Sequence, residues 1–464
     1  MSIKHYFHES LLREYDIRGI VNETLFEADA FIIGKIFGTR VLENNGRSVA
    51  IGRDGRHSSI KMETALVEGL QSAGVDAHKI GECPTPQLYY ATHTLKMGGG
   101  IMVTGSHNPP NYNGFKMMLG TRPFFGSDIK DMAKTAATGD YKSGLGKVIK
   151  TDIFSNYIDR LLLNINLEKQ LSIVWDCGNG SAGPAVEALC KRLRGKHKIL
   201  FSEVNGDFPN HHPDPSNPEN LKFCKEEVLK RRFDLGIAFD GDGDRIGVVD
   251  DKGRDVPGDI LLLVLSKFLI EEKKNALIIG DIKCSQVLFD EIEKIGAKSI
   301  ISKTGHSHVK MNMKKYNADL AGEMSGHIFF KSNYGFDDAL YASIELIKIL
   351  TKSDKKLSQI IDEIPKVYNT PEIRIDCDEN KKFSLIESVC KSQKKLNKNI
   401  LDIDGLRVKS EDGWWLLRAS NTQPGIVLRC ESESQAGLHK QIENVKSAIK
   451  VFDVNLAQKI LVEN

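Results

Sequence analysis

The chain has 464 residues, of which 41% are hydrophobic and 27% charged, and its 64 Lys and Arg face 62 Asp and Glu. This average globular composition excludes a disordered, collagenous or low-complexity protein. The net charge of +2 excludes a surface that is basic throughout and built to coat nucleic acid, but it permits a local basic pocket for a small anion.

The length of the chain and its lack of membrane-spanning or secretory segments further restrict the kind of protein it can be. At roughly 100–200 residues per domain, the length predicts about three or four domains. No segment approaches the roughly 20 consecutive apolar residues that span a bilayer, and the N-terminus lacks a secretory signal. The eight cysteines are scattered singly, which predicts reduced thiols and no zinc site. We expect a cytoplasmic protein that binds no nucleic acid and no membrane and has no evident obligate protein partner.

Helical and strand patterns alternate through most of the chain. The first round comprises helices 27–43 and 59–74 and strands 48–52 and 98–104. The second comprises strands 171–177 and 197–204 and helices 184–193 and 218–231. The third comprises helices 259–271, 284–295 and 306–316 and strands 276–280 and 299–302. Such alternation predicts crossover connections and mixed or parallel sheets.

The last hundred residues follow a different pattern. They contain closely spaced strands and then a long helix, at 400–408, 413–418, 425–430 and 434–451. The predicted fold is therefore three similar α/β domains with mixed sheets plus a C-terminal α+β domain with an antiparallel sheet, arranged around a central cleft. We expect the domain boundaries 1–152, 153–255, 256–367 and 368–464.

The first of four polar loops follows the apolar strand at 100–103. It reads Thr-Gly-Ser-His-Asn-Pro over 104–109 and places Ser106 at the carboxyl end of a strand, where open α/β sheets bind ligands. A serine beside His107 can be an activated nucleophile. Alone, the segment is equally typical of a polar turn whose side chains bond their own backbone.

The second loop reads Asp-Gly-Asp-Gly-Asp-Arg over 240–245, between two apolar strands. Its three carboxylates on alternate residues repel one another unless a cation neutralises them, and oxygen ligands indicate Mg²⁺ or Ca²⁺. An EF-hand needs Gly and Glu where Arg245 and Asp251 stand, so a calcium loop of that type is excluded. The loop favours a metal that acts on a phosphate.

The third loop reads Gly-Glu-Met-Ser-Gly-His over 322–327. Its carboxylate, hydroxyl and imidazole suit recognition of sugar hydroxyls and proton transfer. A tight polar turn explains the same residues equally well.

The fourth loop reads Arg-Ala-Ser-Asn-Thr-Gln-Pro over 418–424. One guanidinium followed by short hydrogen-bonding side chains is typical of a phosphate site. The alternative is a polar hairpin turn.

One motif points to another class of protein. Residues 178–183 satisfy Gly-x-Gly-x-x-Gly between a strand and a helix, and Glu203 follows about 20 residues later, as in dinucleotide-binding enzymes. This keeps a nicotinamide dehydrogenase as an alternative, although tight strand–helix packing explains the glycines equally well.

The four loops fall about one to each predicted domain. Four domains around one cleft would bring together a nucleophile, a metal, a sugar-binding loop and a phosphate site. That combination suits phosphoryl transfer on a phosphosugar, in which positioning and charge neutralisation supply most of the catalysis.

In the order and spacing of all four motifs, the whole sequence resembles the α-D-phosphohexomutase superfamily, specifically its bacterial phosphomannomutase/phosphoglucomutase branch. The resemblance implies that Ser106 is a phosphoserine that binds Mg²⁺ together with Asp240, Asp242 and Asp244. It implies that Glu323, Ser325 and His327 contact sugar hydroxyls and that Arg418, Ser420, Asn421 and Thr422 hold the non-reacting phosphate. Further family-like positions are Tyr15, Arg18, Lys116, Lys283 and His306.

The resemblance implies a reaction in two transfers through a hexose 1,6-bisphosphate, which is also the activator. Ser106 gives its phosphoryl group to a hexose 1-phosphate and takes back the other one, leaving hexose 6-phosphate. Lys116 is the candidate acid/base, with Arg18 and His327 as alternatives. His107 and Arg245 are the further catalytic candidates, beside the transferring group.

Substrate choice depends on the third loop. In the family, Met324 and His327 go with glucose and mannose phosphates, whereas Gln at the first position marks phosphoglucosamine mutases. We expect a phosphosugar substrate of the glucose or mannose series. The alternatives are a phosphoglucosamine mutase and a metal-dependent phosphosugar phosphatase.

Overall fold

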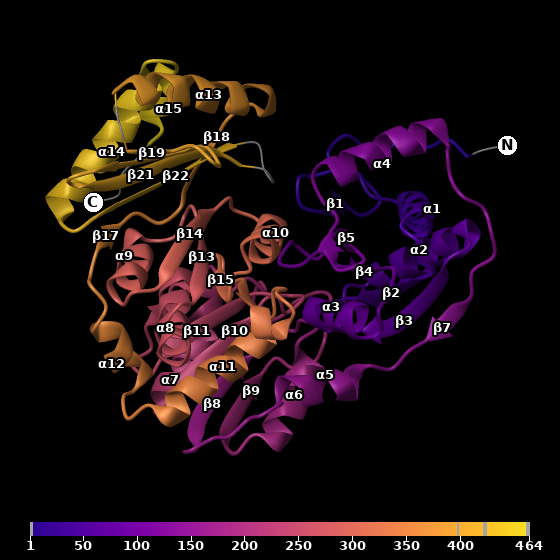
Figure 1. Cartoon of the computed structure of the whole chain (residues 1–464), viewed down its shortest axis with the longest axis horizontal. Helices are drawn as coiled ribbons and strands as arrows, with labels where there is room; N and C mark the ends of the chain where they lie inside the picture. The colour runs from indigo at the N-terminus through magenta and orange to yellow at the C-terminus, as the bar shows by residue number, and fades with distance from the viewer. Residues whose placement is uncertain (1–2, 397–398, 421–424, 461–464) are drawn as a thin grey trace.

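The computed structural model describes residues 3–396, 399–420 and 425–460 and contains four β-sheets (Figure 1). Each sheet together with its helices is called a unit, and the units are numbered 1 to 4 in chain order. Among the described residues, none of the helices combines the length and the apolar character needed to cross a membrane.

Unit 1 is a mixed sheet in the order β1-β5-β4-β2-β3-β7, with β6 paired to β5. Strands β4, β2, β3 and β7 are parallel, and β5 runs antiparallel to β4 and β1. The strands are β1 (Ile17–Ile20), β2 (Ser48–Arg53), β3 (Asp76–Glu82), β4 (Gly99–Val103), β5 (Tyr112–Leu119), β6 (Arg122–Pro123) and β7 (Val148–Lys150). The helices are α1 (Glu27–Glu43), α2 (Ser59–Ala73), α3 (Thr85–Thr94) and α4 (Ser127–Thr138).

Unit 2 is a mixed sheet in the order β12-β11-β10-β8-β9. Its strands are β8 (Leu171–Asp176), β9 (Gly195–Leu200), β10 (Leu235–Phe239), β11 (Ile246–Asp250) and β12 (Asp255–Val256). Its helices are α5 (Phe154–Leu161), α6 (Gly183–Arg192), the 3₁₀ turn η1 (Pro218–Leu221) and α7 (Lys222–Arg231). The predicted helix 218–231 thus begins with a 3₁₀ turn, and the predicted strand 197–204 ends early, at Leu200, before Phe201 enters the left-handed region at φ 53°.

Unit 3 has the strand order β14-β13-β15-β16, parallel except for the last pair. The strands are β13 (Leu277–Asp281), β14 (Lys298–Ser302), β15 (Leu320–Gly322) and β16 (Ile328–Phe330). The helices are α8 (Gly258–Glu272), α9 (Gln286–Lys294), α10 (His306–Tyr316), η2 (Lys331–Asn333), α11 (Ala339–Lys352) and α12 (Leu357–Asp362).

Unit 4 is antiparallel, in the order β17-β22-β21-β20-β19, with β18 also paired to β22. Its strands are β17 (Tyr368–Asn369), β18 (Ile373–Asp376), β19 (Ile400–Leu401), β20 (Leu406–Ser410), β21 (Gly413–Ala419) and β22 (Gly425–Ser432). Its helices are α13 (Glu379–Leu396), α14 (Gln435–Lys450) and α15 (Val454–Gln458). The prediction of one strand over 400–408 is wrong, because the chain turns at Gly405 (φ 75°) and forms the hairpin β19–β20.

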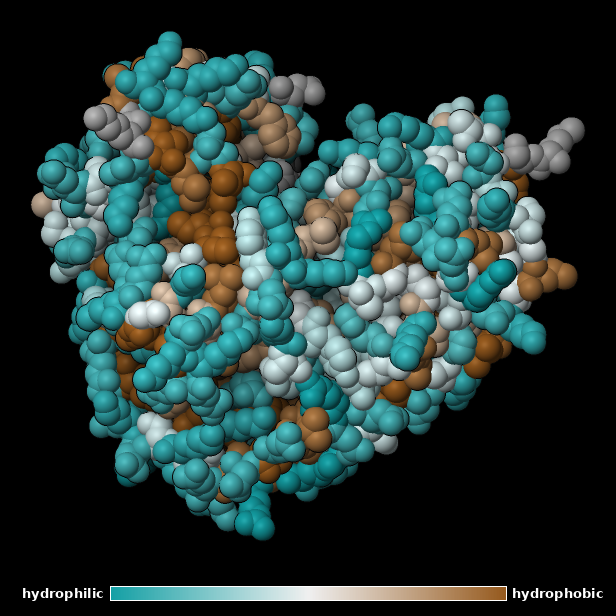
Figure 2. All heavy atoms as spheres, in the orientation of Figure 1, coloured by the Kyte–Doolittle hydropathy of each residue, from teal (hydrophilic) through white to brown (hydrophobic). Residues whose placement is uncertain are grey.

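The three mixed sheets and the antiparallel C-terminal sheet confirm the predicted fold class. Units 2 and 3 share one continuous apolar core, which runs from Tyr157 to Ile364, whereas units 1 and 4 have cores of their own. Unit 4 packs on unit 3 through a small apolar cluster of Ile282, Trp414 and Leu416. Figure 2 shows the molecule hollowed between unit 4 and unit 1. The two outer units thus flank a central body.

Candidate active site

Ser106 stands directly beyond β4 in a left-handed conformation, at φ 49°. Its backbone N–H donates to Thr104 Oγ1 at 2.7 Å, which fixes this unusual turn. The side chain is buried and its Oγ donates to Asp240 Oδ2 at 3.0 Å, while His107 Nδ1 lies 3.3 Å away. The hydroxyl of unit 1 therefore touches the acidic loop of unit 2.

Arg56 and Asp54 hold this loop in place, and sequence reasoning missed both. The Arg56 guanidinium, 1% exposed, donates to the carbonyl oxygens of Ser106 (2.8 Å) and Asn108 (2.6 Å), and also to those of Pro109 and Tyr112. Asp54 accepts from Thr104 Oγ1 at 2.8 Å and pairs with Arg56. Asp54 and Arg56, separated by one glycine directly after a strand, are the feature of the sequence that could have indicated this role.

The acidic loop joins β10 to β11 and buries all three carboxylates completely. Lys116 on β5 donates to Asp242 Oδ2 at 2.7 Å and also to Asp244 Oδ2. Burial opposes the charge on Lys116, but the two carboxylates outweigh it and raise its pKa. Burial and the neighbouring carboxylates raise the pKa of Asp240 well above its ordinary value. The loop thus carries more negative charge than Lys116 alone neutralises.

The acidic cluster has the chemistry of a metal site. One oxygen from each of Asp240, Asp242 and Asp244 lies within 4.8 Å of the others. Asp242 Oδ1 is buried and accepts no hydrogen bond among the described residues. A buried carboxylate oxygen without a donor is costly unless a cation binds it. The residues therefore fit a divalent cation held by oxygen ligands.

The glycine motif at 178–183 packs against the backbone of the acidic loop. Ser181 donates through its N–H and its Oγ to Gly241 O, at 3.0 and 3.2 Å. A Cβ at Gly180 would lie 2.8 Å from the same oxygen, and one at Gly183 would lie 1.9 Å from Ser202 O. Close backbone packing explains these glycines, so the dinucleotide alternative loses its only support.

The third loop, between β15 and β16, brings His327 against the acidic loop. His327 Nε2 lies 3.3 Å from Asp244 Oδ1, and its Nδ1 lies 3.0 Å from Glu323 Oε2 and from Ser325 Oγ. Burial opposes protonation, but Asp244 and Glu323 outweigh it and raise the pKa of His327 to about 9. Arg245 Nε lies 3.3 Å from His327 Nε2, and the two residues form a backbone bridge that joins units 2 and 3 at the site.

His306 and Tyr15 extend the site toward unit 1. The rings of His306 and His327 lie 5.7 Å apart, and neither nitrogen of the buried His306 forms a hydrogen bond among the described residues. Burial, reinforced by Lys310 and Lys116, lowers the pKa of His306 well below its ordinary value. Tyr15 Oη donates to Thr304 O at 2.8 Å. His306 Nδ1 lies 3.4 Å from Asp337 Oδ2, so a neutral imidazole beside a carboxylate faces the site.

The remaining cations are held by carboxylates. Arg18 donates to Asp16 Oδ2 at 2.9 Å and reaches Asn108 of the serine loop. Lys283 donates to Glu372 at 3.0 Å, and Arg418 pairs with Asp404 at 3.1 Å. Lys283 and Arg418 are thus fixed at the boundary of units 3 and 4, while the other candidates gather around Ser106.

The fourth loop is described only in part. Ser420 donates through its N–H to Gly425 O at 2.9 Å, and its own carbonyl accepts from the buried Lys382 at 2.6 Å. Asn421 and Thr422 lie outside the described residues. Lys382, on α13, is a third buried residue that sequence reasoning missed.

Comparison with known proteins decides the family. Domain models described as phosphoglucomutase/phosphomannomutase alpha/beta/alpha domains I, II and III and C-terminal domain match residues 9–141, 155–253, 257–368 and 372–448. The chain belongs to this family. It is therefore a mutase, an intramolecular phosphotransferase, which confirms the expected family and enzyme class.

Individual relatives agree over nearly the full length. The phosphomannomutase/phosphoglucomutase of Pseudomonas aeruginosa is 40% identical over 96% of this chain and 97% of its own. The phosphoglucomutase of Neisseria gonorrhoeae is 39% identical over 95% and 96%. A crystal structure of a phosphoglucomutase/phosphomannomutase family protein from Burkholderia thailandensis superposes with a TM-score of 0.91, at 37% identity, covering 98% of this chain and 99% of that one.

Proposed function

We propose that this phosphohexomutase interconverts the 1- and 6-phosphates of glucose and mannose through a phosphoserine at Ser106. The observation that carries the proposal is the 3.0 Å contact between Ser106 Oγ and Asp240, inside a group that includes Lys116, Arg245 and His327. It supports a serine that exchanges a phosphoryl group beside a cation-binding loop. The domain boundaries 1–152, 153–255, 256–367 and 368–464 belong to the same proposal.

Asp240, Asp242 and Asp244 would hold Mg²⁺ together with an oxygen of phosphorylated Ser106. When bound, the metal neutralises negative charge on the phosphoryl group. Since a phosphoserine carries about −1.5 to −2 charges near neutral pH, Arg245 and Lys116 would add positive charge on the protein side. His107, beside the hydroxyl, would orient the transferring group.

In the first transfer, the free 6-hydroxyl oxygen of a hexose 1-phosphate attacks the phosphorus of phosphoserine 106. The new O–P bond forms as the Oγ–P bond breaks. The leaving Oγ takes a proton from the acid/base, for which Lys116 is the candidate and Arg18 and His327 the alternatives, and the proton of the attacking hydroxyl then restores that group. The hexose 1,6-bisphosphate then reorients in the site, and Ser106 Oγ attacks the 1-phosphoryl group. This leaves hexose 6-phosphate and restores the phosphoserine.

Binding residues would come from units 1, 3 and 4. Glu323, Ser325 and His327 would bind sugar hydroxyls, and the ring of His306, whose nitrogens form no hydrogen bond among the described residues, would add one more polar contact. Arg418 and Ser420, with Asn421 and Thr422 assigned from sequence, would hold the non-reacting phosphate. Tyr15 and Lys283 would complete the binding set. This phosphate site must accept either end of the bisphosphate in turn. Because it holds the phosphate that does not react, it would lie apart from Ser106.

The test is a side-by-side assay of glucose 1-phosphate, mannose 1-phosphate and glucosamine 1-phosphate, with Mg²⁺ and glucose 1,6-bisphosphate. We expect conversion of the first two to their 6-phosphates without release of inorganic phosphate. A preference for glucosamine 1-phosphate would contradict the assignment from Met324 and His327. Stoichiometric phosphate release would instead indicate a phosphatase.

A further inference from the structure

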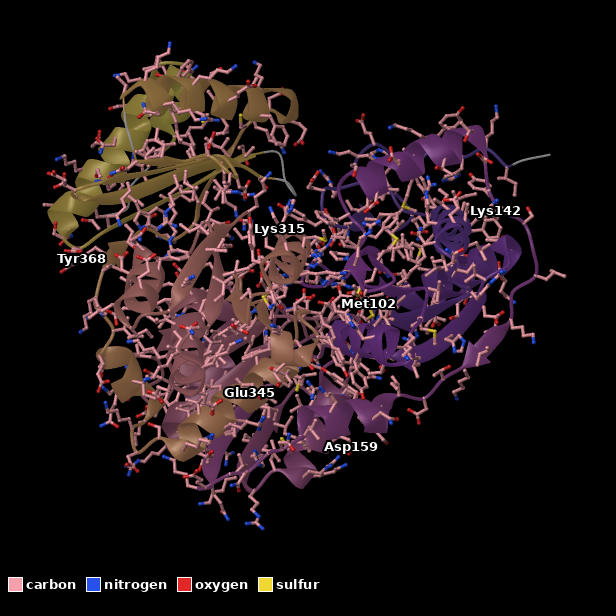
Figure 3. All side chains as sticks on the ribbon, viewed as in Figure 1. Met102, Lys142, Asp159, Lys315, Glu345 and Tyr368 are labelled. Carbon is pink, nitrogen blue, oxygen red and sulfur yellow. The ribbon has the colours of Figure 1, made fainter. Side chains whose placement is uncertain are left out.

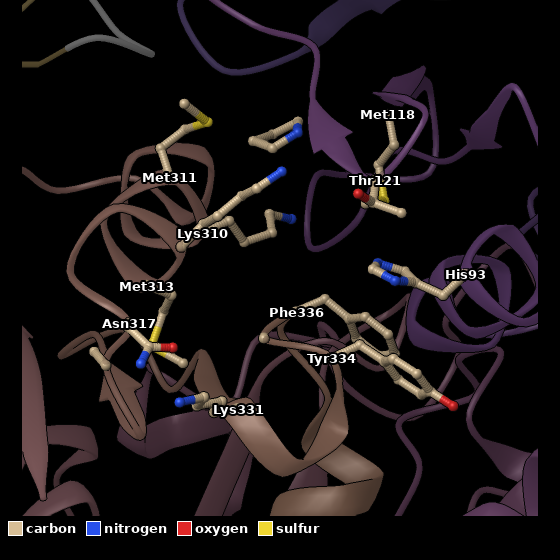
Figure 4. Close-up of a pocket in the computed structure, with 14 residues that line it drawn as sticks. His93, Met118, Thr121, Lys310, Met311, Met313, Asn317, Lys331, Tyr334 and Phe336 are labelled. Carbon is tan, nitrogen blue, oxygen red and sulfur yellow. The ribbon is translucent and has the colours of Figure 1, made fainter. Parts of the chain in front are cut away.

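A cavity of about 300 Å³ lies between units 1 and 3 (Figure 4). Unit 1 contributes His93 of α3, and unit 3 contributes α10 and the segment around η2. Figure 4 shows Lys310 entering from one side and His93 from the other, with Tyr334 and Phe336 between them. None of its lining residues belongs to the proposed catalytic or binding set.

The charged side chains that line this cavity are all lysines. Lys314 forms no ion pair with any described residue. Lys331 Nζ lies 3.9 Å from an oxygen of Asp319 that Lys273 already approaches to 2.6 Å. The buried Lys310 pairs with Asp337 at 2.8 Å. Three lysines around one cavity give it a positive potential, so an anion in the cavity would be stabilised.

The rest of the cavity wall includes a cluster of aromatic rings. The rings of Tyr334 and Phe336 are stacked with centroids 6.1 Å apart, and His93 lies 5.1 Å from Tyr334. Burial, together with Lys310 and Lys314, lowers the pKa of His93 to about 4. At neutral pH its imidazole is therefore uncharged and can both donate and accept a hydrogen bond.

We propose that this cavity binds a phosphate monoester carried on a ring, as in a sugar phosphate or a nucleoside monophosphate. Lys314 and Lys331 would hold the phosphate, and the ring would pack on Tyr334 and Phe336. The volume falls at the lower end of small-molecule sites, which span roughly 300–1,000 Å³. A ligand bound in this cavity would contact both unit 1 and α10 of unit 3, the helix that begins at His306.

Titration calorimetry on the full chain tests this with four probes, namely AMP, ribose 5-phosphate, adenosine and orthophosphate. We expect at least one of the two esters to bind more tightly than adenosine and orthophosphate, with and without saturating glucose 1,6-bisphosphate. The ester that binds better identifies the ring as a nucleoside or a sugar. In K314A/K331A the affinity should fall at least about tenfold, since hydrogen bonds to charged groups are worth about 1.5–3 kcal/mol each.

The control is K315A, because Lys315 is the exposed neighbour on α10 and does not line the cavity (Figure 3). Its affinity for the esters should equal that of the unchanged chain. Absence of ester binding, or ester binding that K314A/K331A leaves unchanged, would overturn the proposal. Ester binding that glucose 1,6-bisphosphate abolishes would place the ligand at Ser106 and would also overturn it.

Discussion

The guanidinium of Arg56 donates to the backbone carbonyl of Ser106 at 2.8 Å. The same group reaches three further carbonyl oxygens of residues 108–112. Arg56 thus fixes the path of the loop that presents the proposed nucleophile, without touching its hydroxyl. We regard it as a positioning residue.

We expect Arg56→Lys to lower kcat about 10²-fold, because a lysine keeps the charge but cannot bridge four oxygens, and small misplacements of a reacting group have effects of that size. KM should change less than kcat. Steady-state kinetics against Arg53→Lys, whose side chain bonds Glu82 outside the loop, provides the matched control. Equal kcat in the two variants would contradict a positioning role.

Removal of the metal should abolish turnover. We expect EDTA to inactivate the enzyme and added Mg²⁺ to restore it, because the acidic cluster has a buried oxygen without a hydrogen-bond partner among the described residues, which a cation would stabilise. Asp242→Asn should lower kcat by on the order of 10²–10³, the usual effect of removing a group that stabilises transition-state charge. Asp207→Asn, an exposed acid of the same unit, serves as control. Full activity of Asp242→Asn in EDTA would exclude the metal site.

Arg418 should control substrate affinity more than the chemical step. We expect Arg418→Lys to raise KM about tenfold or more while kcat falls less, because a lysine cannot bind a phosphate with two parallel hydrogen bonds. Initial-rate kinetics on glucose 1-phosphate measures both constants. Arg192→Lys, a surface variant paired only with Asp159, should behave as the unchanged enzyme. A fall in kcat at constant KM would place Arg418 at the transferring group instead.

Asp338 makes the stability of the central body depend on pH. Burial raises the pKa of Asp338 to about 7, although Tyr341 N–H, Tyr157 and Asn333 bond its carboxyl. The folded protein therefore holds this proton more tightly than the unfolded chain. The stability that Asp338 contributes is complete below about pH 4 and is lost as the pH rises through about 7.

Asp338→Asn has no proton to lose, so its unfolding free energy should gain about 2–4 kcal/mol relative to the unchanged protein between pH 4 and pH 8. Urea unfolding of both proteins at the two pH values measures this. The exposed Asp354→Asn should show no such gain. Parallel pH curves for Asp338→Asn and the unchanged protein would contradict the raised pKa.

The sequence predicted the parts of the molecule that obey local rules. Helices 27–43 and 306–316 have the predicted bounds, because amphipathic periodicity determines them. The hairpin at β19–β20 was missed, although Asp404-Gly405 between apolar residues is a typical hairpin-turn signal. Spacing alone also placed Asp240, Asp242 and Asp244 in one cluster, since they share a loop.

Contacts between distant segments could not be predicted in the same way. Arg56 and Lys382 appear in the sequence as ordinary surface cations, and only the folded chain buries them against the carbonyls of Ser106 and Ser420. Lys283 likewise pairs with Glu372 across the contact between units 3 and 4, and Arg418 pairs with Asp404 from a neighbouring turn of unit 4.

The most direct test of the account is the fate of a labelled phosphoryl group. Glucose 1,6-bisphosphate labelled in its phosphates is incubated with the enzyme and Mg²⁺, and the chain is digested and analysed by mass spectrometry. The account predicts one labelled phosphoryl group per chain, on Ser106, and neither label nor mutase turnover in Ser106→Ala. Label on another residue, or a Ser106→Ala variant that retains full turnover, would contradict it.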